Sequence, residues 1–162
     1  MPKKISSAIL CVIAIMVPMF MVSACTQKQH GTAYTVYYAN NQGTSLLENV
    51  IFIDENDQYV IAQRLLDSMN SESSKECSVI KPVNVNSPTV EFDSIYVNVY
   101  FDSSYYDMKP STEVLYRAAV VKELCQIEGV TYVRFYVDGK DAVYDDGSNI
   151  GNMSAEDFID SS

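Results

Sequence analysis

Two segments of the chain alternate between apolar and polar side chains, and this alternation constrains the fold more than any other feature. Residues 94–101 read SIYVNVYF and residues 131–137 read TYVRFYV. Because successive side chains of a strand point to opposite faces of a sheet, each segment predicts a strand with one apolar face. The apolar faces are expected to contain Ile95, Val97, Val99 and Phe101 in one strand, and Val133, Phe135 and Val137 in the other.

A second helix is predicted between Pro110 and Glu128, with Ser111 or Thr112 as its N-cap. Gly129 favours an end at this point, because glycine commonly follows the last residue of a helix. An apolar stripe along this helix is expected to face the sheet. It consists of Val114, Ala118, Val121 and Cys125, with Leu115 and Leu124 beside it.

Shorter patterns complete the element order. An acidic start at residues 54–57 precedes apolar residues at helical spacing, which predicts a first helix from about Asn56 to Met69. Further strands are predicted at residues 35–38, 49–53, 79–85 and 142–144. The order β-β-α-β-β-α-β-β predicts an α+β fold, a two-layer sandwich with two helices packed on one face of a mixed or antiparallel sheet.

The first 25 residues have a different composition from the rest of the chain. Two lysines precede an uncharged, mostly apolar segment at residues 5–24, which is the layout of a secretory signal. That segment ends in VSAC at residues 22–25, which resembles a bacterial lipobox. The resemblance implies that residues 1–24 are a lipoprotein signal peptide and that Cys25 carries the lipid on the extracytoplasmic face of the cell membrane. An uncleaved transmembrane helix and plain secretion are the alternatives.

The acidic charge excludes some partners. The chain has 11 Lys and Arg against 21 Asp and Glu, giving a formal charge of -10. Loss of residues 1–24 removes two lysines and no acidic residue, so the charge becomes -12. Such a domain is not suited to nucleic acid or to an anionic bilayer surface. Two acyl chains of a diacylglycerol on Cys25, followed by a polar linker over residues 25–33, would anchor it instead.

Residues 129–140, GVTYVRFYVDGK, resemble the end of a GerMN domain. Other parts of that domain resemble residues 36–38, 96–103 and 153–158, so the resemblance runs from Tyr34 to Phe158. It implies a GerMN-like domain over residues 34–162, including an acidic C-terminal tail. GerMN domains often occur on lipoproteins of Gram-positive bacteria, so the resemblance implies a non-enzymatic role in assembling envelope proteins in sporulation or germination.

The residues themselves favour no catalytic chemistry. The single histidine, His30, lies in the expected linker, and no G-x-S-x-G or glycine-rich phosphate loop occurs. The Asp-Gly sequences at residues 138–141 and 145–147 lack the spacing of a calcium loop and fit hairpin turns. A pair of catalytic carboxylates or a solvated acidic surface would both account for the abundant Asp and Glu. We expect no catalytic residue, metal or cofactor.

The polar faces of the two alternating strands form the candidate binding site. The chain has 12 tyrosines and no tryptophan, and tyrosine and arginine are enriched at protein interfaces. We call this set the tyrosine face: Tyr96, Asn98, Tyr100, Tyr132, Arg134 and Tyr136. It is expected to bind an envelope protein or a second copy of the chain. A wall glycan or small ligand is the alternative, and cross-strand tyrosines that only stabilise the sheet are another.

Cys77 and Cys125 remain after Cys25 is assigned to the lipid. Outside the cytoplasm the two thiols could form a disulfide. Cys125 also belongs to the apolar stripe of the second helix, where a buried thiol is common. Both interpretations stay open.

Overall fold

The fold is taken from a computed structural model, which describes residues 30–39, 44–70 and 88–158. The described part contains two α-helices and two sheets, which confirms the predicted α+β class. The predicted strand at residues 79–85 lies outside the described residues. In chain order the elements are β1 (Thr32–Ala39), β2 (Leu46–Ile53), α1 (Gln58–Asn70), β3 (Thr89–Asp93), β4 (Tyr96–Phe101), the 3-10 helix η2 (Ser103–Asp107), α2 (Pro110–Leu124), β5 (Tyr132–Val137), β6 (Lys140–Asp141), β7 (Asn152–Met153) and the 3-10 helix η3 (Ala155–Phe158).

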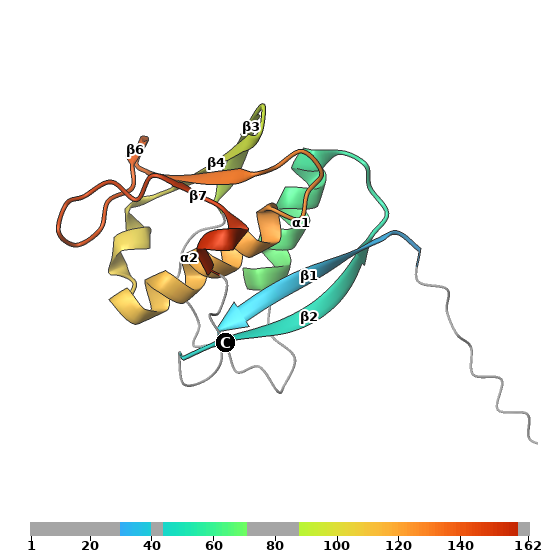
Figure 1. The fold of residues 1–162 in the computed structure, drawn as a ribbon, viewed down its shortest axis with the longest axis horizontal. Coiled ribbons are helices and arrows are strands. Elements are labelled where there is room, and N and C mark those ends of the chain that lie inside the picture. The colour runs from blue at the N-terminus through green and yellow to red at the C-terminus, as the bar shows by residue number, and fades with distance from the viewer. Residues whose placement is uncertain (1–29, 40–43, 71–87, 159–162) are drawn as a thin grey trace, which may run out of the picture.

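The larger sheet is mixed and has the order β3-β4-β5-β6, with β7 also paired to β5. Strands β4 and β5 are parallel, and α2 connects them, whereas the other pairs are antiparallel. The hairpin β1-β2 is a separate sheet. Both helices contact this hairpin as well as the larger sheet, so they lie between the two sheets (Figure 1).

Side chains of α2 and of the turn after it explain why β1 does not join the larger sheet. Gln126 accepts a hydrogen bond from the Thr35 N–H at 2.7 Å and donates one to the Thr35 carbonyl at 2.7 Å. Oε1 of Glu123 accepts from the Tyr37 N–H at 2.8 Å. The backbone groups that a further strand would bind are therefore satisfied by side chains. The pattern of apolar residues alone does not distinguish this arrangement from one continuous sheet.

Burial of Glu123 makes stability depend on pH. Its side chain is fully buried, and Oε2 has no hydrogen-bond partner among the described residues. Burial raises the pKa of Glu123 well above its ordinary value, and the Tyr37 N–H opposes this only in part. Because the folded chain then binds a proton that the unfolded chain releases, stability falls as pH rises above the ordinary pKa of a glutamate.

We expect Glu123→Gln to raise the free energy of unfolding at pH 8 by more than about 1 kcal/mol, because the amide keeps an acceptor for Tyr37 and needs neither a buried charge nor a bound proton. The gain should shrink toward pH 5. Urea unfolding of the two chains at both pH values measures it, with the exposed Glu128→Gln as the control. An equal effect of Glu123→Gln at both pH values would contradict the account.

Helix α2 differs from its prediction in both its ends and its buried surface. Its N-cap is Lys109, not Ser111 or Thr112, because Pro110 takes the first helical position, for which its fixed φ is suited. The α-helix ends at Leu124, four residues before the predicted end. Packing between two sheets buries it on several sides, so a single stripe is not observed: Val114 is 47% exposed, whereas Arg117 and Glu123 are buried.

The turns at the ends of the strands produce further differences. Ser94 has a positive φ of 56°, and β4 begins only at Tyr96. Ile95 therefore lies in the turn and is 44% exposed, which contradicts its predicted place on the apolar face. Strand β3 was not predicted, and the predicted strand at 142–144 is reduced to an isolated bridge between Val143 and Asn149.

The N-terminal boundary also differs. β1 begins at Thr32, so Thr32 and Ala33 are paired with Ile53 and Phe52 rather than lying in a linker. A Cβ on Gly31 would lie 2.5 Å from the carbonyl oxygen of Ile53, and its φ of 110° suits only glycine. None of the described helices is long and apolar enough to cross a membrane.

Candidate binding face

The register of β4 and β5 brings all six residues of the tyrosine face together. The strands are parallel, and Tyr96 lies beside Tyr132, Asn98 beside Arg134, and Tyr100 beside Tyr136. All six side chains are half-buried, in contrast to the fully buried valines and phenylalanines that alternate with them. The two helices pack against that apolar side, and no described helix covers the tyrosine face (Figure 1).

Aromatic stacking orders the two ends of this face. The rings of Tyr96 and Tyr132 are 5.5 Å apart between centroids, at an interplanar angle of 25°. Those of Tyr100 and Tyr136 are 4.9 Å apart at 20°. Stacked pairs at such distances are favourable beyond the area that they bury. The four tyrosines therefore form two ordered patches rather than four independent side chains.

Polar contacts hold the middle and one edge of the face. The Arg134 guanidinium lies 3.6 Å from the centroid of the Tyr96 ring, and its Nε donates to Oδ1 of Asn152 at 2.8 Å. The Tyr100 hydroxyl donates to Glu91 on β3 at 2.9 Å, and this hydrogen bond raises the pKa of Tyr100. The side-chain oxygen of Asn98 is buried and has no hydrogen-bond partner among the described residues. The face is thus preorganised, and the Asn98 oxygen lies beneath its surface.

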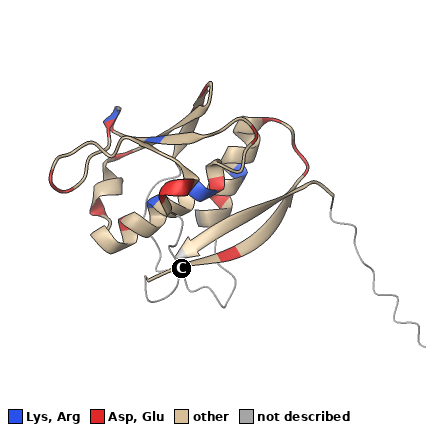
Figure 2. Ribbon diagram, viewed as in Figure 1, with Lys and Arg blue, Asp and Glu red and all other residues tan. Residues whose placement is uncertain are grey.

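Both signs of charge occur at the face, because Arg134 lies on it and Glu91 borders it, although the chain as a whole is acidic. Figure 2 shows Asp and Glu spread over the elements of both sheets and both helices. No group of three or more His, Cys, Asp or Glu in residues 30–39, 44–70 and 88–158 is placed to hold a metal ion. Within the described residues, the tyrosine face is the candidate site, because pairing and stacking order its aromatic and polar side chains.

The predicted cysteine sites are only partly described. Cys25 and Cys77 lie outside the described residues. Cys125 forms no disulfide with another described residue and is half-buried, with Sγ 3.5 Å from the Thr131 carbonyl oxygen. Burial raises the pKa of its thiol. Both the lipid on Cys25 and a bridge between Cys77 and Cys125 stay predictions.

Sequence reasoning missed a cluster around Arg117. This arginine is only 3% exposed, and its Nη1 lies 3.2 Å from Oε1 of Glu113, one helical turn earlier. The Glu-x-x-x-Arg spacing could have predicted this ion pair, since residues four apart are neighbours on a helix. The spacing did not reveal that Arg117 would be buried beside Tyr105 and Tyr144, because those residues come from other segments.

The mixed sheet with two helices on its apolar side, joined to a hairpin on their other side, defines an α+β domain. A family described as "Germane: Sporulation and spore germination" matches residues 35–143, more than half of the chain. The chain therefore belongs to this family of GerMN domains, which confirms the resemblance drawn from residues 129–140. Among curated proteins, no sequence matches the chain.

Solved structures of the family show the same fold. The first GerMN domain of the sporulation protein GerM from Bacillus subtilis has a TM-score of 0.62 at 12% identity, covering 77% of this chain and 98% of that domain. The tandem GerMN domains of the same protein match with a TM-score of 0.57 at 17% identity, covering 82% of this chain. The match covers 47% of the tandem, so the chain spans about half its length.

Proposed function

We propose that the chain is a non-enzymatic lipoprotein, anchored through Cys25 on the extracytoplasmic face of the membrane, whose tyrosine face binds an envelope protein. The observation that carries the proposal is the register of β4 and β5, which places the six residues of the tyrosine face side by side in three pairs. Tyrosine and arginine supply large contact area together with hydrogen-bonding groups, and they dominate interface hot spots. Membership of a sporulation and spore germination family supports a role in one of those processes.

The preorganisation of this face supports binding over a purely structural role. Stacking restricts all four tyrosine rings before any partner arrives, so less side-chain entropy is lost on association. The cation on Arg134 gives the face a charged polar group between the two aromatic patches. A surface of this kind favours a protein partner with exposed apolar and polar side chains.

Photo-crosslinking in living cells tests the proposal. p-Benzoylphenylalanine is introduced in place of Tyr132 on the tyrosine face, and in a second chain in place of Tyr59 on α1. Tyr59 is 50% exposed and belongs to another element, which makes it a matched aromatic control. We expect a discrete protein adduct from position 132 and none of the same size from position 59.

The outcomes separate the two candidate partner classes. An adduct with one envelope protein supports assembly, and an adduct of twice the chain's mass identifies a second copy. Retention of the chain on purified wall polymer, together with no protein adduct from position 132, supports the glycan alternative. Identical adducts from positions 132 and 59 would show that the tyrosine face is not selective and would overturn the proposal.

A further inference from the structure

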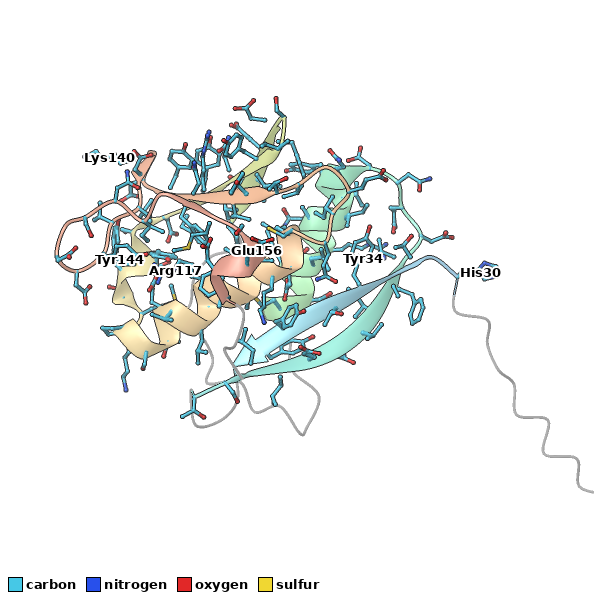
Figure 3. The ribbon with its side chains drawn as sticks, viewed as in Figure 1. His30, Tyr34, Arg117, Lys140, Tyr144 and Glu156 are labelled. Carbon is cyan, nitrogen blue, oxygen red and sulfur yellow. The ribbon has the colours of Figure 1, made fainter. Side chains whose placement is uncertain are left out.

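A pocket of about 140 Å³ lies beside α2, at a place separate from the tyrosine face. Tyr105 and Tyr106 of η2, Glu113 and Arg117 of α2, and Tyr144 of the segment after β6 contribute to its lining. Figure 3 shows the labelled Arg117 and Tyr144 next to one another, and the guanidinium carbon is 4.8 Å from the centroid of the Tyr144 ring. None of the interactions described above for the tyrosine face involves this pocket.

The guanidinium of Arg117 lacks the acceptors that a buried arginine needs. Its ion pair with Glu113 joins Nη1 and Oε1 at 3.2 Å, but Nε and Nη1 have no hydrogen-bond acceptor among the described residues. The same Glu113 oxygen also accepts a hydrogen bond from the Tyr105 hydroxyl. Leaving a buried charged donor without acceptors is costly, and Nε and Nη1 lie on different edges of the guanidinium, so each of them favours a further acceptor.

The rim of the pocket is apolar. Of eight large apolar side chains that are exposed among the described residues, four line this pocket, with exposed fractions from 37% to 49%: Tyr106, Val114, Val143 and Tyr144. Clustering of this kind on a protein surface marks a binding site more often than scattered apolar residues do. A ligand here would therefore place an apolar group against the rim, next to the hydrogen-bond acceptor that reaches Arg117.

We propose that this pocket binds a carboxylate flanked by an apolar side chain, in a peptide segment of a partner protein. A planar carboxylate pairs with one edge of a guanidinium, which means Nη2 together with either Nε or Nη1, so it would supply an acceptor to one of the two donors. Glu113 and Asp145 also line the pocket, and their negative charge disfavours a dianionic phosphate more strongly than a monoanionic carboxylate. Nε and Nη1 are shielded from water in the structure, so binding requires the exposed Tyr144 ring, which lies over the guanidinium, to turn aside as the carboxylate enters.

Capped dipeptides test the proposal on the full chain in mild detergent, with valine methyl signals in NMR as the readout. N-acetyl-Leu-Glu-amide presents a side-chain carboxylate, N-acetyl-Leu-Leu presents a terminal carboxylate, and N-acetyl-Leu-Gln-amide presents neither. We expect saturable shifts of the Val114 and Val143 methyl signals with at least one carboxylate probe. The responding probe identifies the carboxylate source. No shift with either acid, or equal shifts with the glutamine peptide, would overturn the proposal.

Two variants verify the location of the binding site. Val114→Glu adds a negative charge at an exposed rim position, and we expect it to weaken binding of the responding probe about tenfold or more, as read from Val143. Val50→Glu makes the same change at a position on β2 that is 53% exposed and away from the pocket, and should leave the affinity unchanged. Equal affinities of these two variants would contradict the site. Arg117→Lys should also lose binding, but the exposed Val114→Glu variant keeps the test valid if that chain unfolds.

Discussion

The double variant Tyr96→Ser with Tyr136→Ser is expected to lose partner binding while it keeps its fold. Each change removes one ring from a different stacked pair. Tyrosines at interface hot spots cost about 2 kcal/mol or more of binding free energy when truncated, so partner affinity should fall about 30-fold or more. Loss of the two stacked pairs should lower the free energy of unfolding by only about 1–3 kcal/mol.

Two measurements on the same protein separate these effects: the amount of crosslinked partner recovered from position 132, and the thermal midpoint of unfolding. Tyr59→Ser is the control, because it removes an exposed tyrosine from α1 and leaves both stacked pairs intact. A collapse of the thermal midpoint in the double variant would show that these rings are part of the core. Unchanged midpoint and unchanged partner recovery would leave the face as ordinary sheet surface.

Cys25→Ala is expected to abolish lipid attachment, because a lipobox cysteine is joined to its lipid through the thiol sulfur, which alanine lacks. Two acyl chains give stable membrane anchoring, and a chain with a formal charge of -10 is not attracted to an anionic bilayer surface. The variant should therefore appear in the medium or as an unprocessed precursor. Metabolic labelling with a fatty-acid analogue, followed by fractionation of membrane and medium, measures both effects.

Cys11→Ala supplies the matched control for this prediction. Cys11 lies within the apolar segment at residues 5–24, so its loss leaves the VSAC sequence at residues 22–25 unchanged. Labelling of this variant should equal that of the parent chain. If Cys25→Ala incorporates as much label as Cys11→Ala, then Cys25 is not the lipid attachment site.

Alternation predicted the central strands well because it reports directly on the two faces of a sheet. Val97, Val99, Val133 and Phe135 are buried, and the polar residues between them lie on the opposite side. The placement of the tyrosine face followed from this pattern once the strands were assumed to pair. The parallel register sets each tyrosine beside another. It depends on the path of the chain through α2, which connects the two strands, so the sequence of either strand alone could not predict it.

Features that depend on contacts between distant segments were missed. The separate hairpin depends on Glu123 and Gln126 binding the backbone of β1, which lies 86 and 91 residues away in sequence. The buried position of Arg117 likewise depends on η2 and on the segment after β6. Single-sequence patterns describe one element at a time, so a polar residue on a helix is expected at the surface unless its distant partners are known.

The measurement that tests the central claim most directly is the yield of the protein adduct from p-benzoylphenylalanine at position 132, with and without Tyr100→Ser. Tyr100 does not stack on the ring at position 132 but on Tyr136, in the other patch of the tyrosine face. If a partner covers both patches, Tyr100→Ser should reduce the adduct about tenfold or more at equal chain abundance. An adduct of undiminished yield would contradict the claim that the partner covers both patches, and the absence of any adduct from position 132 would contradict the claim that this face binds it.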